Sequence, residues 1–187
     1  QKMTNFAYSG VPSREALAKT FGLEELRIGH HYLRSYPKHG ERLGSLWVKY
    51  YWLLEVRPSF NDPFVVCAVS TDGELFDNNI TPSWTKVTFA TSKISEVLEV
   101  SGDPLPDVLN RCKLLPAGKN LTLDGVGYQL EFANSQLQGR LQFANPKEES
   151  LINIVSTVLR TAQEVAINSG NQDLCQIWEI WHRYEPH

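Results

Sequence analysis

Three histidines close together in the sequence are the residues best suited to chemistry. His30, His31 and His39 fall within ten consecutive residues. A neutral imidazole exchanges protons near pH 7 and is also a common metal ligand. With Glu41 or Asp62 as a second titratable group, this stretch would support acid–base catalysis.

The spacing of these histidines does not favour a metal site. Side chains of adjacent residues point to opposite sides of an extended chain, so His30 and His31 would diverge. No HExxH, HxH or CxxC pattern accompanies them. GxSxG and complete GxGxxG motifs are also missing. We therefore expect no metal and no cofactor, and catalysis by these histidines stays one hypothesis among three.

A surplus of large aromatic side chains is the second feature that could carry function. The chain has five Trp, seven Tyr and eight Phe. Tyr and Trp on an exposed face are typical of protein-binding surfaces. The opposite expectation is that the tail of the chain packs over such a face and buries it. The candidate contact residues are His30, His31, Tyr36, His39, Trp47, Tyr51, Trp178 and Trp181.

The sequence favours binding over catalysis, because its apolar residues are patterned for a core and the surplus aromatic residues are not accompanied by any catalytic or cofactor motif. The first hypothesis is a non-catalytic module that binds another protein. An inhibitor or immunity-type protein, which occludes a toxin or an enzyme, is an example. The alternative is a carrier that holds a small apolar ligand in a cavity between sheet and helix, lined by Tyr50, Trp52, Tyr128 and Phe132.

Charge and hydropathy exclude other partners. Eighteen Lys and Arg against 21 Asp and Glu give a net charge of −3, which opposes nucleic-acid binding by bulk charge. The longest apolar run, 64–69, is far shorter than the ~18 residues of a membrane span. We expect a soluble protein, either cytoplasmic or, if Gln1 follows a removed signal peptide, periplasmic or secreted.

The cysteines do not form an obvious disulfide framework. Cys67, Cys112 and Cys175 are odd in number and far apart. Three free thiols and one disulfide are both compatible with this pattern.

The candidate histidines and aromatic residues must be positioned by the fold. The chain of 187 residues is predicted to form one α+β domain over 1–187. Apolar residues alternate strictly from Leu46 to Val56, which predicts a strand with one wholly apolar face, ended by Pro58. Further strands are predicted over 64–71, with a turn at Asp72-Gly73, over 74–76 and 84–90, and in a meander over 121–123, 126–132 and 137–143.

Helices are predicted before, between and after these strands in the sequence. Ser13 and Gly22 would bound a short N-terminal helix, and Asn145 would cap a long helix over 146–168. Two short helices are expected over 92–100 and 107–115. The segment 30–44 is predicted to be mainly loop, and the aromatic tail 174–184 favours a strand over a helix. Together these elements predict an antiparallel sheet of six or seven strands with the long helix across its apolar face.

Overall fold

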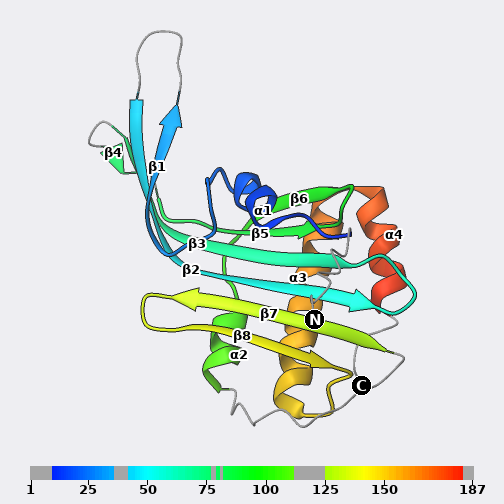
Figure 1. Ribbon diagram of the computed structural model, residues 1–187. Helices are drawn as coiled ribbons and strands as arrows, with labels where there is room; N and C mark the ends of the chain where they lie inside the picture. Colours follow the sequence, from blue (N-terminus) through cyan, green and yellow to red (C-terminus); the bar gives the residue numbers. More distant parts are fainter. Residues whose placement is uncertain (1–9, 36–41, 77–78, 81, 112–124, 183–187) are drawn as a thin grey trace, which may run out of the picture.

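The computed structural model describes residues 10–35, 42–76, 79–80, 82–111 and 125–182. Eight strands in this part of the chain form one antiparallel sheet, which confirms the α+β fold (Figure 1). The main order is β6-β5-β3-β2-β7-β8, with β1 paired to β2 and β4 paired to β3. The strands are β1 (Gly29–Ser35), β2 (Arg42–Pro58), β3 (Phe64–Phe76), β4 (Asn79–Ile80), β5 (Thr85–Ala90), β6 (Ser95–Val100), β7 (Val126–Asn134) and β8 (Gln138–Ala144).

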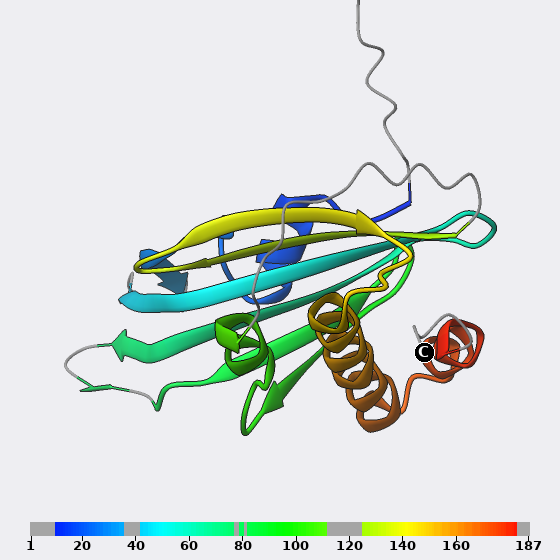
Figure 2. The same cartoon turned by 90° about the horizontal axis from the view of Figure 1, so that it is seen from below.

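Helices cover both faces of this sheet. Figure 2 shows α2 (Leu105–Arg111), α3 (Glu149–Ser169) and α4 (Gln172–Trp181) on one face. On the opposite face lies α1 (Arg14–Thr20), whose N-cap Ser13 accepts a hydrogen bond from the backbone N–H of Ala16. The Ser13 cap and the long C-terminal helix are both confirmed, although the long helix begins later than predicted.

Each face of the sheet has its own hydrophobic core. The first core joins the sheet to α2, α3 and α4, and Trp52, Phe64 and Val158 are among its buried members. The second core joins the sheet to α1 and the chain after it, through residues such as Leu17, Leu26 and Val65. Strands β2 and β3 are therefore buried on both faces, which explains their nearly continuous apolar sequence.

The alternation along β2 does not define a single face, contrary to the sequence interpretation. Val48 is paired with Thr71 and Tyr50 with Ser70, so the register shifts between these two pairs. A β-bulge of this kind changes the side on which the following residues lie. Leu46 and Val48 consequently belong to the second core, whereas Trp52 belongs to the first.

Two predictions around the neighbouring strands were wrong. The Asp72-Gly73 pair does not end a strand, because β3 continues through it to Phe76 with Gly73 at φ 103°. The segment 92–100 contains the strand β6 rather than a helix. Thr91 shapes the turn before β6, where its hydroxyl oxygen accepts hydrogen bonds from the N–H groups of Lys93 and Ile94.

The tail and the start of the long helix also differ from the prediction. The tail forms α4, whose N-cap Asn171 accepts hydrogen bonds from the N–H groups of Asp173 and Leu174. Asn145 does not cap α3. It adopts φ 43°, and its side-chain oxygen accepts a hydrogen bond from the N–H of Val126 at the start of β7. The segment 30–44, expected to be mainly loop, contributes β1 and the first residues of β2.

Candidate functional site

The first candidate surface is an arm that extends from the body of the sheet (Figure 1), where β2 pairs with β1 on one side and with the end of β3 on the other. We define the arm as β1 together with residues 42–48 of β2, which pair in one antiparallel register. One face of the arm is buried, because His31, Leu46 and Val48 are each at most 4% exposed. The Nε2 atom of His31 lies 2.9 Å from the backbone oxygen of Arg27. This face anchors the arm to the second core.

The opposite face of the arm is open and aromatic. His30 lies directly across from Trp47, and their rings meet edge to face with centroids 4.7 Å apart. Tyr32 follows His30 by two residues and so projects from the same side of β1. Tyr32 is 72% exposed and Trp47 is 40% exposed. We call His30, Tyr32 and Trp47 the aromatic face.

The arm also presents a strand edge. Within the described residues β1 pairs with β2 alone, so backbone groups along its other side are not used by the sheet. Arg27 satisfies one of them, since its Nη2 donates to the backbone oxygen of His30 at 2.6 Å. An edge strand beside exposed aromatic side chains is a surface on which a second chain can add.

The structure brings only part of the predicted contact set together. Tyr36 and His39 lie outside the described residues. Trp181 is buried in the first core, where its ring meets that of Phe64 at 4.7 Å, and Trp178 is half-buried beside it. The tail therefore packs on the face of the sheet that α2 and α3 cover, at a distance from the arm (Figure 1).

Tyr51 is buried as well, so it offers no surface to a partner. Its hydroxyl accepts a hydrogen bond from Arg14 Nη2 at 2.5 Å and donates one to Glu131 Oε1 at 3.0 Å. Sequence reasoning missed Tyr32. The alternation of His30, Tyr32 and Arg34 with His31 and Leu33 was the available signal for a strand exposing it.

The residues proposed to line a carrier cavity fill the first core instead. Trp52 and Tyr128 are at most 3% exposed, with Tyr50 and Phe132 packed beside them. Tyr50 and Trp52 donate hydrogen bonds to Asp103 Oδ2, at 3.1 and 2.6 Å. Asp103 Oδ1 accepts from the N–H of Leu105 at the start of α2. Burial raises the pKa of the Asp103 carboxyl above its usual value.

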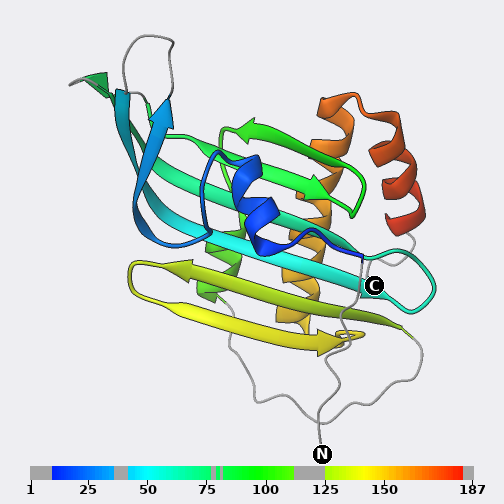
Figure 3. The ribbon, with the colours of Figure 1, turned by 45° about the horizontal axis from the view of Figure 1, so that its top comes forward.

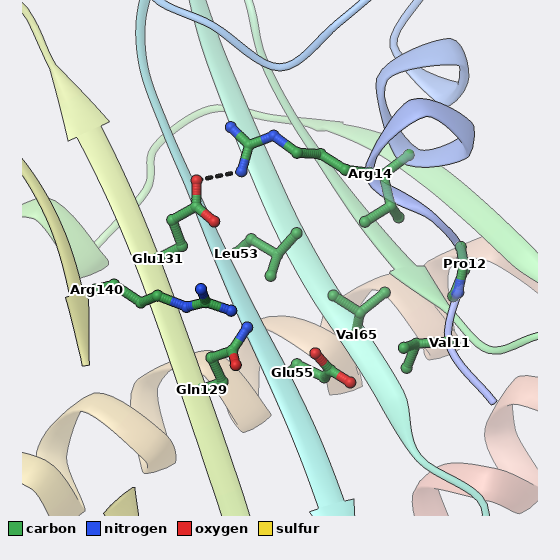
Figure 4. Close-up of a pocket in the computed structure, with 10 residues that line it drawn as sticks. Val11, Pro12, Arg14, Leu53, Glu55, Val65, Gln129, Glu131 and Arg140 are labelled. Carbon is green, nitrogen blue, oxygen red and sulfur yellow. Dashed lines mark hydrogen bonds and ion pairs between the residues drawn. The ribbon is translucent and has the colours of Figure 1, made fainter. Parts of the chain in front are cut away.

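A pocket of about 200 Å³ lies on the outer face of the sheet, beside α1 (Figure 4). Arg14 spans its upper end and forms an ion pair with Glu131. We call it the outer-face pocket. Figure 3 shows α1 lying across this side of the sheet, over β2 and β3. The lining residues are Val11, Pro12, Arg14, Leu17, Leu53, Glu55, Val65, Gln129, Glu131 and Arg140.

The described residues do not assemble the predicted acid–base pair. His30 and His31 lie on the arm at the beginning of β2, whereas Asp62 lies in the connection after the end of β2. Glu41 and His39 are outside the described residues. In the part of the chain that the structure describes, no three His, Cys, Asp or Glu side chains converge as a metal site requires.

Cys67 and Cys175 are free thiols, and burial raises the pKa of the Cys67 thiol. None of the helices described is both long and apolar enough to cross a membrane. Comparison with protein-family models, curated proteins and solved structures gives no match for this chain.

Proposed function

We propose that this protein is a protein-binding module and that the aromatic face of the arm is its contact surface. The observation that carries the proposal is the exposure of Tyr32 and Trp47 on the same face of a strand pair whose other face is buried. Tyr, Trp and Arg are enriched among the residues that dominate binding energy at protein interfaces. An occluding inhibitor would use a surface of this kind.

The construction of the arm supports this proposal. His30 contacts the Trp47 ring edge to face, which restricts the rotamers that the indole samples before a partner arrives. Ordering a side chain at an interface costs roughly 0.5–1.5 kcal/mol, so a pre-positioned ring loses less affinity on binding. The buried residues Leu46 and Val48 hold the strand beneath it.

The partner that fits this surface is another protein with an extended segment. Such a segment would pair with the open edge of β1 and place apolar side chains over Tyr32 and Trp47. Main-chain hydrogen bonds would then supply affinity, and the aromatic side chains would supply specificity.

Site-specific photo-crosslinking tests the proposal. A photoreactive phenylalanine analogue replaces Tyr32 in the full chain, expressed in its native host, and adducts are identified by mass spectrometry. Phe60 is the matched control, because it is aromatic, 81% exposed and located in the β2–β3 connection away from the arm.

We expect one discrete adduct with a different protein from position 32 and none from position 60. Equal labelling from both positions would contradict the proposal, as would the absence of any adduct at position 32. An adduct of twice the 21.2 kDa chain mass would contradict a foreign partner and show that the arm contacts a second copy of this chain.

A further inference from the structure

The charges around the outer-face pocket pair off and leave one cation over. Arg14 is committed, because it forms an ion pair with Glu131 and donates to the backbone oxygen of Leu26 at 2.7 Å. Glu55, only 6% exposed, accepts a hydrogen bond from Arg57 Nε at 2.6 Å. Each carboxylate at the pocket therefore has a guanidinium of its own.

Arg140, an exposed residue of β8, is the remaining cation. It has no hydrogen bond or ion pair with any residue that the structure describes, although Glu131 is its cross-strand neighbour in register. Figure 4 shows its side chain reaching across β7 toward Gln129 and the middle of the pocket. The Gln129 side chain likewise has no hydrogen bond to described residues. A guanidinium and a carboxamide thus face the same space, and neither is paired with a described residue.

The opposite wall of the pocket is apolar. Val11 and Pro12 precede α1 on one side, and Leu53 and Val65 lie beneath them on β2 and β3. A ligand that fits both walls has an apolar body and one anionic group. The two carboxylates that line the pocket, Glu55 and Glu131, would repel a dianion such as phosphate more than a monoanion.

Size and shape narrow the ligand further. Sites for drug-sized molecules enclose roughly 300–1,000 Å³, whereas this pocket encloses about 200 Å³. A guanidinium matches a planar carboxylate through two parallel N–H···O bonds. We propose that the outer-face pocket binds a small free carboxylic acid with an apolar body, whose carboxylate is held by Arg140 and Gln129. This site is independent of the protein-binding proposal, because it lies on α1, β2, β3, β7 and β8 and not on the arm.

Three molecules of one shape test this proposal with the full chain. Benzoate, benzamide and benzylamine carry a negative, a neutral and a positive group on the same ring. Binding is measured by titration calorimetry, and the site is located from amide chemical-shift changes in NMR spectra. Arg140→Gln removes the free cation, and Arg160→Gln removes an exposed arginine on α3, across the sheet.

We expect benzoate to bind and to shift the amide signals of Leu53, Val65 and Gln129. Benzamide should bind roughly tenfold more weakly or worse, because a hydrogen bond to a charged group contributes about 1.5–3 kcal/mol and 1.4 kcal/mol is tenfold in affinity. Benzylamine should not bind. Arg140→Gln should reduce benzoate affinity by a similar factor, and Arg160→Gln should leave it unchanged.

Several results would overturn the proposal. These are equal binding of the three molecules, no binding of benzoate, shifts confined to other parts of the chain, or equal effects of the two arginine variants. An acetylated peptide with a free carboxyl end that binds more tightly than benzoate would show that the natural ligand is a chain terminus and not a free acid.

Discussion

Asp103 shows how a single residue connects the sheet to a helix. Its carboxylate accepts hydrogen bonds from the Trp52 indole on β2 and from the backbone N–H of Leu105 in α2. The sequence placed Trp52 in the apolar interior but gave no sign of its partner, which is 51 residues away. A buried indole N–H must find an acceptor, and only the folded chain shows which one it uses.

The titration of Asp103 leads to a pH prediction. Burial, the largest cause, raises the pKa of this carboxyl above its usual 3.8, so the folded state binds the proton more tightly than the unfolded state does. The contribution of Asp103 to the unfolding free energy should therefore fall as the pH rises from about 3.8 through the folded pKa, and then level off. Asp103→Asn cannot titrate and should lack this fall.

Urea unfolding of both proteins between pH 3 and pH 8 measures the effect. The unfolding free energy of the natural chain minus that of Asp103→Asn should decrease as the pH rises. A difference that stays constant or increases would show that this carboxyl is not held in a desolvated site.

At the scale of elements, the sequence predicted the features that depend on neighbouring residues alone. The N-cap Ser13 and the apolar stripe of α3 are both found as expected, and Val158 in the stripe is fully buried. The start of α3 was predicted wrongly because Asn145 uses its side-chain oxygen on Val126, which is 19 residues earlier. A capping box is defined by residues close together in sequence. Here the predicted capping residue, Asn145, instead accepts a hydrogen bond from a distant part of the chain.

The strand β6 and the helix α4 show the same limit. Ile94, Val97 and Leu98 have helical spacing, yet the chain from Ser95 pairs with β5, so tertiary pairing overrides the local pattern. For α4, Asn171 at the N-cap and Asp173 in the first turn did signal a helix. The aromatic and β-branched residues of the tail obscured that signal, because composition alone does not separate a buried helix from a strand.

Gly139 offers a test of packing between β7 and β8. It lies opposite Phe132, and a Cβ atom at this position would overlap the Phe132 ring. We expect Gly139→Ala to lower the unfolding free energy by about 1–3 kcal/mol, the usual cost of overpacking. Gly102→Ala is the matched control, since a Cβ there meets nothing within 4 Å.

Urea denaturation of the two alanine variants makes the comparison. The Gly102 variant should stay within about 0.5 kcal/mol of the natural chain, as most exposed substitutions do. If Gly139→Ala is equally stable, the close contact between Phe132 and β8 is not present in solution.

At the scale of the whole molecule, the two faces of the sheet are covered by helices to different extents. One face is covered by α2, α3 and α4, whereas α1 covers only part of the other (Figure 2). The outer-face pocket lies beside α1. The sequence identified His30 and Trp47 as candidates, but it could not tell that Tyr51 and Trp181 are buried. Which aromatic side chains are covered depends on how distant elements pack, and that information is not in the local pattern.

The affinity of the crosslinked partner for arm variants tests the central claim most directly. The double variant Tyr32→Ala, Trp47→Ala is compared with Phe60→Ala, Leu137→Ala, in which both altered side chains are also exposed. We expect the arm variant to lose roughly 100-fold or more in affinity, since each residue that dominates an interface contributes about 2 kcal/mol or more. Its melting temperature should stay close to that of the control, and the control should keep full affinity. Equal affinity of the two double variants would contradict the assignment of the aromatic face as the binding surface.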